Sequence, residues 1–183
     1  RYSVQVEDEL DATWLPTLPQ ISQIRASDQW RYDVATRDFI SVREGITTSG
    51  LRYEFTGIEL TYDPALLDAA SSGRTTVRSV FTDVPADLDP RITDLATRVT
   101  ASAPTRFQKM QLLQRWFRED GGFTYDLSAV DSLGEADADL MAFLDVSGRS
   151  GYCEQFAAAM ALMARTLGVP SRVAVGFLEP ESI

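Results

Sequence analysis

The single cysteine of this 183-residue sequence stands where a nucleophile could act. Cys153 follows Gly151 and Tyr152, and the apolar periodicity after it predicts a helix over 153–168, ended by Gly168 and Pro170. A helix N-terminus carries about half a positive charge, which lowers the pKa of a thiol placed there. Its free N–H groups can also bind an oxyanion. One interpretation of Cys153 is therefore a nucleophile for acyl transfer.

A structural role is the second interpretation, and position alone favours it. Free cysteine is among the most buried residue types, and Cys153 falls on one helical stripe with Phe156, Met160 and other apolar residues. Glu154 complements the helix dipole, yet its charge would raise the pKa of the neighbouring thiol. A cationic partner from elsewhere would have to outweigh it.

Composition limits which chemistry these residues can complete alone. The sequence has 17 Lys and Arg against 27 Asp and Glu, one Cys and no His. Without imidazole it cannot assemble a Ser-His-Asp or Cys-His pair, and one Cys gives neither an intrachain disulfide nor a cysteine metal cluster. We expect no cofactor and no bound metal. The basic residues are scattered between acids, which argues against a nucleic-acid partner.

Acidic residues dominate the stretch from 119 to 145, which contains no basic residue. A divalent-cation loop and an anionic rim that attracts an amine are two interpretations. The spacing lacks the glycine of an EF-hand loop, so a solvated loop is favoured. The stretch contains Glu119, Asp120, Asp126, Asp131, Glu135, Asp137, Asp139 and Asp145.

Residues 1–82 are typical of a β-rich module. Alternating apolar residues predict strands around Trp30–Val34, Phe39–Arg43 and Leu51–Leu60. The apolar face switches after Gly57, which predicts a bulge there. No polar constellation in this module resembles a catalytic site, so we expect a scaffold or a contact surface.

Helical spacing begins after Pro85. Asp89 is expected to cap one helix, with Pro90 at its first position, and Thr105 to cap a second that ends at Gly121-Gly122. Residues 123–125 suit a short strand, and a third helix is expected to carry Leu140, Phe143 and Leu144. After the Cys helix, the alternation over Arg172–Phe177 predicts a strand. The fold class is thus α+β, with domains 1–82 and 83–183.

The segment GYCEQFAAAMALMARTLGVPSRVAVGF, residues 151–177, closely resembles the transglutaminase-like superfamily, whose papain-like core places its nucleophile in a G-x-C motif at a helix start. The resemblance covers about residues 85–178 and is nearest to a bacterial branch with an extracytoplasmic domain anchored in the membrane. It implies that 83–183 form the helical N-terminal half of that core, behind an antiparallel β-rich module. It also makes Cys153 the nucleophile, with its own N–H as an oxyanion donor and Gly151 and Tyr152 shaping the approach.

The resemblance implies acyl transfer from glutamine side chains of proteins or peptides in the cell envelope. The family's His and Asp follow the Cys helix on later strands, so neither is assigned to a residue of this sequence. We expect a fragment that is inactive alone, cut from a parent tethered to the membrane and acting on its extracytoplasmic face. The apolar edge at Arg172–Phe177 would favour dimer formation or strand exchange.

Two other functions stay open at this point. The same core could carry a cysteine peptidase or amidase, because these enzymes differ from transglutaminases mainly in leaving group and acceptor. Alternatively, the chain is a non-catalytic interaction module of the cell envelope in which Cys153 is core. The sequence does not separate transfer, deamidation and proteolysis, so the enzyme class of this chain is left uncertain.

Overall fold

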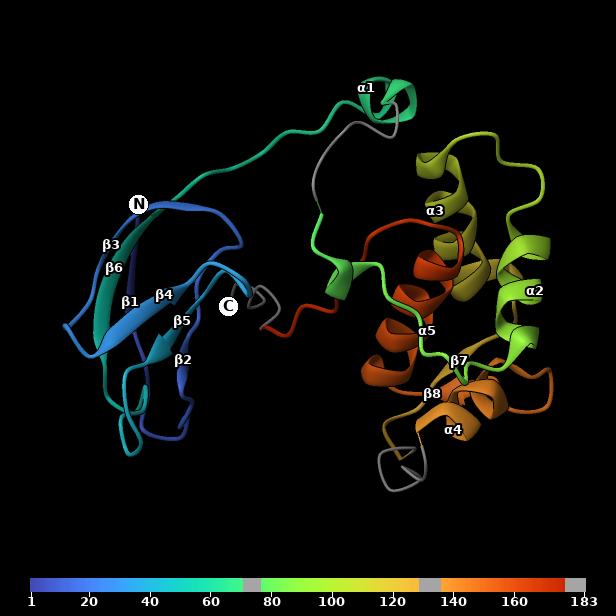
Figure 1. Cartoon of the computed structure of the whole chain (residues 1–183). Helices are drawn as coiled ribbons and strands as arrows, with labels where there is room; N and C mark the ends of the chain where they lie inside the picture. Colours follow the sequence, from blue (N-terminus) through green and yellow to red (C-terminus); the bar gives the residue numbers. More distant parts are fainter. Residues whose placement is uncertain (71–76, 129–135, 177–183) are drawn as a thin grey trace. The chain divides into compact units, whose positions relative to one another are not determined.

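The computed structural model describes residues 1–70, 77–128 and 136–176. This part of the chain divides mainly into two compact units, residues 1–61 and 62–174, the first built of strands and the second mostly of helices (Figure 1). The α+β class and the order of a β-rich module before a helical core are confirmed.

The first unit contains two antiparallel sheets of three strands each. The first has the order β1-β6-β3, and the second has the order β2-β5-β4. Their shared core is formed by Val6, Leu15, Tyr53 and Phe55. The strands are β1 (Tyr2–Gln5), β2 (Trp14–Leu15), β3 (Ile21–Arg25), β4 (Trp30–Asp33), β5 (Asp38–Ser41) and β6 (Arg52–Gly57).

The predicted irregularity near Gly57 is present, but its extra residue lies in the partner strand. The register of β3 against β6 shifts between Ile21 and Gln23, opposite Gly57 and Thr56. A Cβ on Gly57 would lie 2.5 Å from Cδ1 of Leu18. Glycine therefore lets the Leu18 side chain pack directly on the last residue of β6.

The second unit arranges its helices around α5. Its elements are α1 (Pro64–Ala69), the 3₁₀ turn η1 (Ser79–Phe81), α2 (Pro90–Val99), α3 (Arg106–Arg115), the π-helical turn η2 (Trp116–Asp120), β7 (Thr124–Tyr125), α4 (Ala136–Leu144), β8 (Ser150–Gly151) and α5 (Cys153–Thr166). The short strands β7 and β8 are parallel.

Local signals set the helix ends as predicted. The Asp89 carboxylate accepts from the N–H of Arg91 at 2.9 Å, and the Thr105 hydroxyl accepts from the N–H of Gln108 at 3.1 Å. Helix α5 ends two residues before the predicted 168, because Gly168 adopts a left-handed φ of 73° and donates to the Arg165 carbonyl at 2.9 Å.

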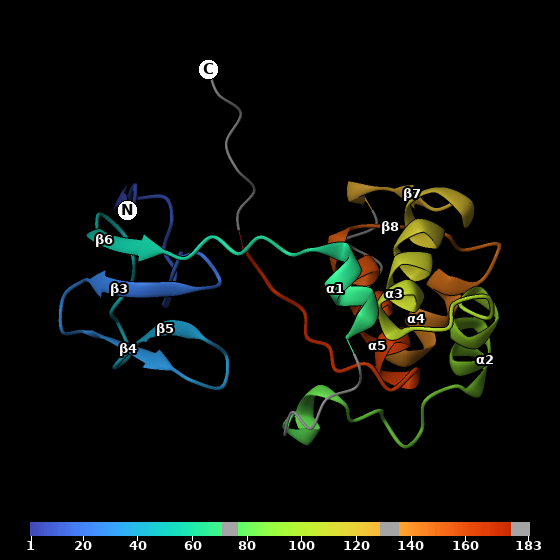
Figure 2. The ribbon, with the colours of Figure 1, turned by 90° about the horizontal axis from the view of Figure 1, so that it is seen from above.

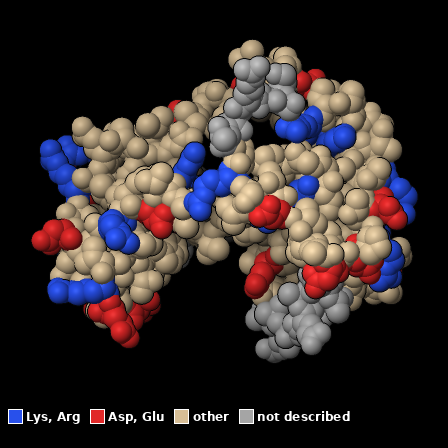
Figure 3. Space-filling model, in the orientation of Figure 1, with Lys and Arg blue, Asp and Glu red and all other residues tan. Residues whose placement is uncertain are grey.

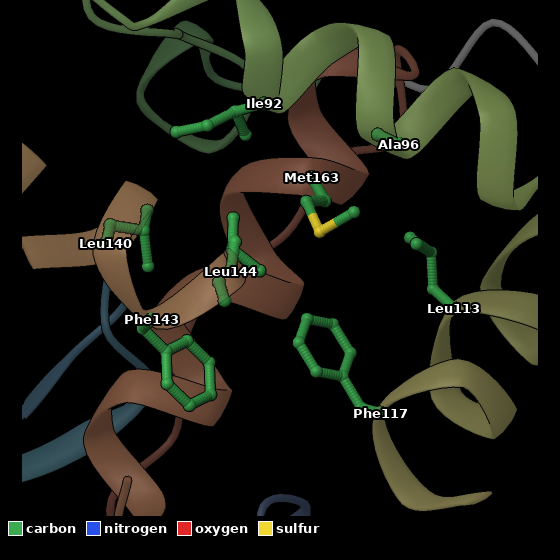
Figure 4. Close-up of a cluster of buried hydrophobic side chains, with 9 residues drawn as sticks. Ile92, Ala96, Leu113, Phe117, Leu140, Phe143, Leu144 and Met163 are labelled. Atoms are coloured by element: carbon green, nitrogen blue, oxygen red, sulfur yellow. The ribbon is translucent and has the colours of Figure 1, made fainter. Parts of the chain in front are cut away.

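Helix α5 is the centre of the helical core. Met163 and Ala159 of α5 are fully buried against side chains of α2, α3 and α4 (Figure 4). The predicted third helix supplies its three named residues to this cluster. The buried members are Ile92, Ala96, Leu113, Phe117, Leu140, Phe143, Leu144, Ala159 and Met163.

Helix α1 belongs to the helical unit and lies beside α3 (Figure 2). Its Asp68 carboxylate accepts from the hydroxyl of Thr105 at 2.6 Å and from the amide of Gln108 at 2.9 Å. These bonds join α1 to the first turn of α3. The predicted division into domains 1–82 and 83–183 stays a prediction.

The strand predicted over Arg172–Phe177 is absent from its described part. Residues 171–176 form no strand, and Phe177 lies outside the described residues. A strand needs a neighbour for its backbone hydrogen bonds, and no described strand pairs with this segment. Val173 and Val175 are consequently exposed.

Burial of Tyr53 makes the folding stability of the first unit decrease at alkaline pH. Burial raises the pKa of Tyr53 to about 12, and its hydroxyl donates to the Pro16 carbonyl. The unfolded chain ionises this phenol from about pH 10, so the contribution to stability is complete below pH 10 and is lost as the pH rises toward 12. We expect a loss of about 1 kcal/mol at pH 11 after solvent screening.

Urea unfolding at pH 7 and pH 11 measures this loss. Tyr53→Phe should remove its share of the alkaline loss, although the variant forfeits the bond to Pro16 at both pH values. Tyr62→Phe, at an exposed position, is the matched control. If the unmutated chain and Tyr53→Phe lost equal free energies of unfolding between pH 7 and pH 11, this assignment would be contradicted.

Candidate active site

Cys153 is the first residue of α5, and its side chain is exposed. Tyr152 precedes it in an extended conformation, with φ −113° and ψ −175°, and its carbonyl accepts from the N–H of Phe156 at 3.3 Å. The predicted placement of Cys153 on the buried stripe is wrong. Of that stripe, Ala164 is buried and Phe156, Met160 and Leu167 pack against the core, whereas the two fully buried residues, Ala159 and Met163, were omitted from it.

Gly151 is required by the space around it. It is buried in β8, and a Cβ there would lie 2.7 Å from Oε1 of Gln155 and 2.9 Å from Cε2 of Phe143. The backbone before the thiol therefore packs directly on an aromatic ring. This close approach, and no special backbone angle, explains the glycine of the motif.

Gln155 fixes the start of the helix, a role that sequence reasoning missed. Its Oε1 accepts from the backbone N–H of Tyr152 at 2.8 Å. This is half of a capping box, in which a residue at the third helical position satisfies the N-cap amide. The usual sequence signature begins with Ser or Thr, and a tyrosine at the N-cap hid it.

Tyr152 and Glu154 form a pair beside the thiol. The Tyr152 hydroxyl donates to the Glu154 carboxylate, and this bond raises the pKa of Tyr152 to about 12. The phenol therefore stays protonated at neutral pH. The pair keeps a negative charge on the surface next to Cys153.

An aromatic cluster supports the first turns of α5. The Phe123 and Phe143 ring centroids are 5.1 Å apart, and the Phe156 centroid lies 5.7 Å from the first and 5.0 Å from the second. These distances are typical of favourable edge-to-face and tilted pairs. The aromatic cluster comprises Trp116, Phe117, Phe123, Phe143 and Phe156, drawn from η2, α4, α5 and the segment before β7.

The β7–β8 pairing positions the strand that leads to the thiol. Thr124 and Tyr125 pair with Ser150 and Gly151, and the N–H of Asp126 donates to the Gly151 carbonyl at 2.8 Å. The Asp126 carboxylate accepts from the hydroxyl and the N–H of Ser128, which lowers its pKa. Asp126 therefore stays ionised while its backbone holds the strand.

In the described part of the acidic stretch, the carboxylates interact with residues close to them in the sequence. Asp120 forms an ion pair with Arg115 at 2.8 Å, and Asp145 accepts from Ser147, which lowers the pKa of Asp145. Asp131 and Glu135 lie outside the described residues. Within 1–70, 77–128 and 136–176, no three His, Cys, Asp or Glu residues group as metal ligands. These described carboxylates fit the solvated interpretation.

Charges of both signs are interspersed over the face that Figure 3 shows. Basic side chains occur there singly or in small groups beside acidic ones. In the described part of the chain, no helix has the length and apolar character that crossing a bilayer requires.

The arrangement provides two of the elements of cysteine acyl transfer. The thiol is open to a substrate, and the first N–H groups of a helix lack intrahelical acceptors, so they can donate to an oxyanion formed at the attacked carbonyl. Proton transfer needs a base such as imidazole, and the sequence contains no His. These 183 residues therefore supply no imidazole for that step.

Comparison with known families agrees with this geometry. Residues 93–183 match the family model of the transglutaminase-like superfamily. The chain belongs to this superfamily. The match contains α3, α4 and the whole of α5 with Cys153.

The similar proteins are longer than this chain. The chain is 26% identical over 101 residues to the uncharacterized protein YebA of Bacillus subtilis (strain 168), covering 55% of this chain and 13% of YebA. The crystal structure of the periplasmic domain of TgpA from Pseudomonas aeruginosa matches with a TM-score of 0.62 and 21% identity, over 92% of this chain and 52% of that one. The ethylmercury-bound form of that domain gives a TM-score of 0.59 at 22% identity, over 92% of this chain and 54% of that one. These likenesses show a shared fold, and this chain spans about half of the solved domain.

Gly151→Ala tests the packing before the thiol. The new methyl group would collide with Gln155 and Phe143, so we expect a loss of about 1–3 kcal/mol in the free energy of unfolding. Gly176→Ala is the control, since nothing lies within 4 Å of a Cβ there. Thermal or urea unfolding measures both, and equal stabilities would refute the packing argument.

Proposed function

We propose that this chain carries the nucleophile of a cysteine acyltransferase that acts on glutamine side chains of proteins or peptides. The observation that carries the proposal is the exposed thiol of Cys153 at the first position of α5, inside the segment that matches the family. Exposure also weakens the view of Cys153 as a core residue, which was the basis of the non-catalytic alternative.

The reaction would proceed through a thioester. The Cys153 thiolate attacks the γ-carboxamide carbon of the substrate, a C–S bond forms, and the amide oxygen takes the negative charge near the first N–H groups of α5. The C–N bond then breaks and ammonia leaves with a proton from the external base. An amine or water attacks the thioester, which returns the thiol and gives an isopeptide or a glutamate.

The proposed location is the extracytoplasmic face of the membrane, in a parent protein tethered there. Support comes from the fold shared with the TgpA domain, which is described as periplasmic. A cell-envelope protein or peptide is the proposed substrate class. No cofactor is needed for this chemistry, since thiol, oxyanion donors and base are all protein groups.

The test uses the parent protein with a glutaminyl peptide and a fluorescent primary amine. We expect incorporation of the amine with release of ammonia, and a loss of at least about a thousandfold in Cys153→Ala because the nucleophile is gone. The 183-residue chain alone should stay at background, because it lacks an imidazole base.

Mass spectrometry of the products separates the alternatives. Cleavage of the peptide backbone in place of amine incorporation would replace the proposal by a cysteine peptidase. Activity that survives in Cys153→Ala would refute the role of the thiol. Turnover by the 183-residue chain would refute its inactivity.

A further inference from the structure

Arg149 lies at the junction between the aromatic cluster and the strand that leads to Cys153. Its guanidinium carbon is 5.2 Å from the ring centroid of Trp116 and 5.2 Å from that of Phe123. Both distances are within the range of cation–π attraction. The Trp116 and Phe123 rings are themselves 4.8 Å apart and nearly perpendicular, at 81°. One cation therefore contacts two rings that already contact each other.

The π-helical turn η2 supplies the third contact. The N–H of Gly121 donates to the Trp116 carbonyl at 2.7 Å, and Nη1 of Arg149 donates to the Gly121 carbonyl. A Cβ on Gly121 would lie 2.5 Å from the Trp116 carbonyl oxygen, so glycine is needed for this tight closure. Isolated π turns are rare and are frequent at functional sites. Here the turn presents an indole ring and a carbonyl to the same guanidinium.

The backbone of Arg149 connects these contacts to β8. Its carbonyl accepts from the N–H of Thr124 at 2.8 Å, immediately before the pairing of Thr124 with Ser150. The following bond, from Asp126 N–H to the Gly151 carbonyl, closes the far end of the same ladder. A strand pair of two residues has little intrinsic stability. At its first end, Arg149 adds the contacts of its side chain to the backbone bonds of the pair.

We propose that Arg149 is a positioning residue that fixes β8 against β7 and thereby places the Cys153 thiol at the start of α5. Three kinds of contact favour this role over a contribution to overall stability alone. Arg149 contacts two aromatic rings, donates to a carbonyl and accepts a bond of the β7–β8 pair, four positions before the thiol. The consequence for catalysis rests on the proposed function of Cys153. The placement of the thiol does not, because it can be measured without turnover.

The test compares the 183-residue chain with its Arg149→Met and Arg149→Lys variants. Methionine keeps much of the length but loses the charge and the donors, so hydrogen exchange of the Thr124 and Asp126 amides should accelerate by about tenfold or more beyond the change in the Leu113 amide of the core. Alkylation of Cys153 by iodoacetamide at pH 7 should slow by about threefold or more, because the thiol leaves the N–H groups of the first turn. Lysine keeps the charge and N–H donors but lacks the planar guanidinium, so both effects should be intermediate.

Arg1→Met is the matched control, because Arg1 makes a surface ion pair with Glu54 in the first unit, whereas the η2 turn and the β7–β8 pair belong to the second. It should leave both amides and the alkylation rate unchanged. The proposal is overturned if Thr124 and Asp126 accelerate only as much as Leu113, or if Cys153 alkylation is unaffected in Arg149→Met. If Arg149→Met does not fold, Arg149→Lys gives the same comparison with a smaller expected effect. A parent without acyltransferase activity would refute the proposed function and leave these measurements valid.

Discussion

The start of α5 depends on how little room surrounds Gly151. A phenyl ring of α4 and the side-chain amide of Gln155 both approach this backbone so closely that a methyl group would collide with them. Strand β8, helix α4 and helix α5 therefore meet at one residue without a side chain. Two residues later, Cys153 is exposed at the helix start.

Because the thiol is exposed, the position of α5 depends on packing of its other turns. Met163 and Ala159 are fully buried among residues of three other helices, so the middle of α5 is anchored by apolar burial. The first turn is held differently, by Gln155 on the Tyr152 amide and by the aromatic cluster beneath it. The middle of the helix is thus held by burial, whereas Cys153 in the first turn is exposed to solvent.

The sequence predicts best what short-range contacts decide. The caps at Asp89 and Thr105 and the stop at Gly168 act within a few residues, and each is found where the pattern places it. The motif also predicts a helix that starts at Cys153, as found, but the prediction that Cys153 is buried is wrong, because the buried face of α5 depends on which helices pack against it. Arg149 had no signal at all, since the rings it contacts lie on distant segments joined to it only by the fold.

The described residues separate two requirements of cysteine catalysis. Placing a thiol beside free helix N–H groups is a task for one helix, one short strand pair and their packing, all within residues 90–166. Moving protons requires an imidazole or an equivalent base, and these 183 residues contain no His. The exposed placement of Cys153 is therefore a property of the helical unit itself, whereas an imidazole is not among the groups that these 183 residues supply.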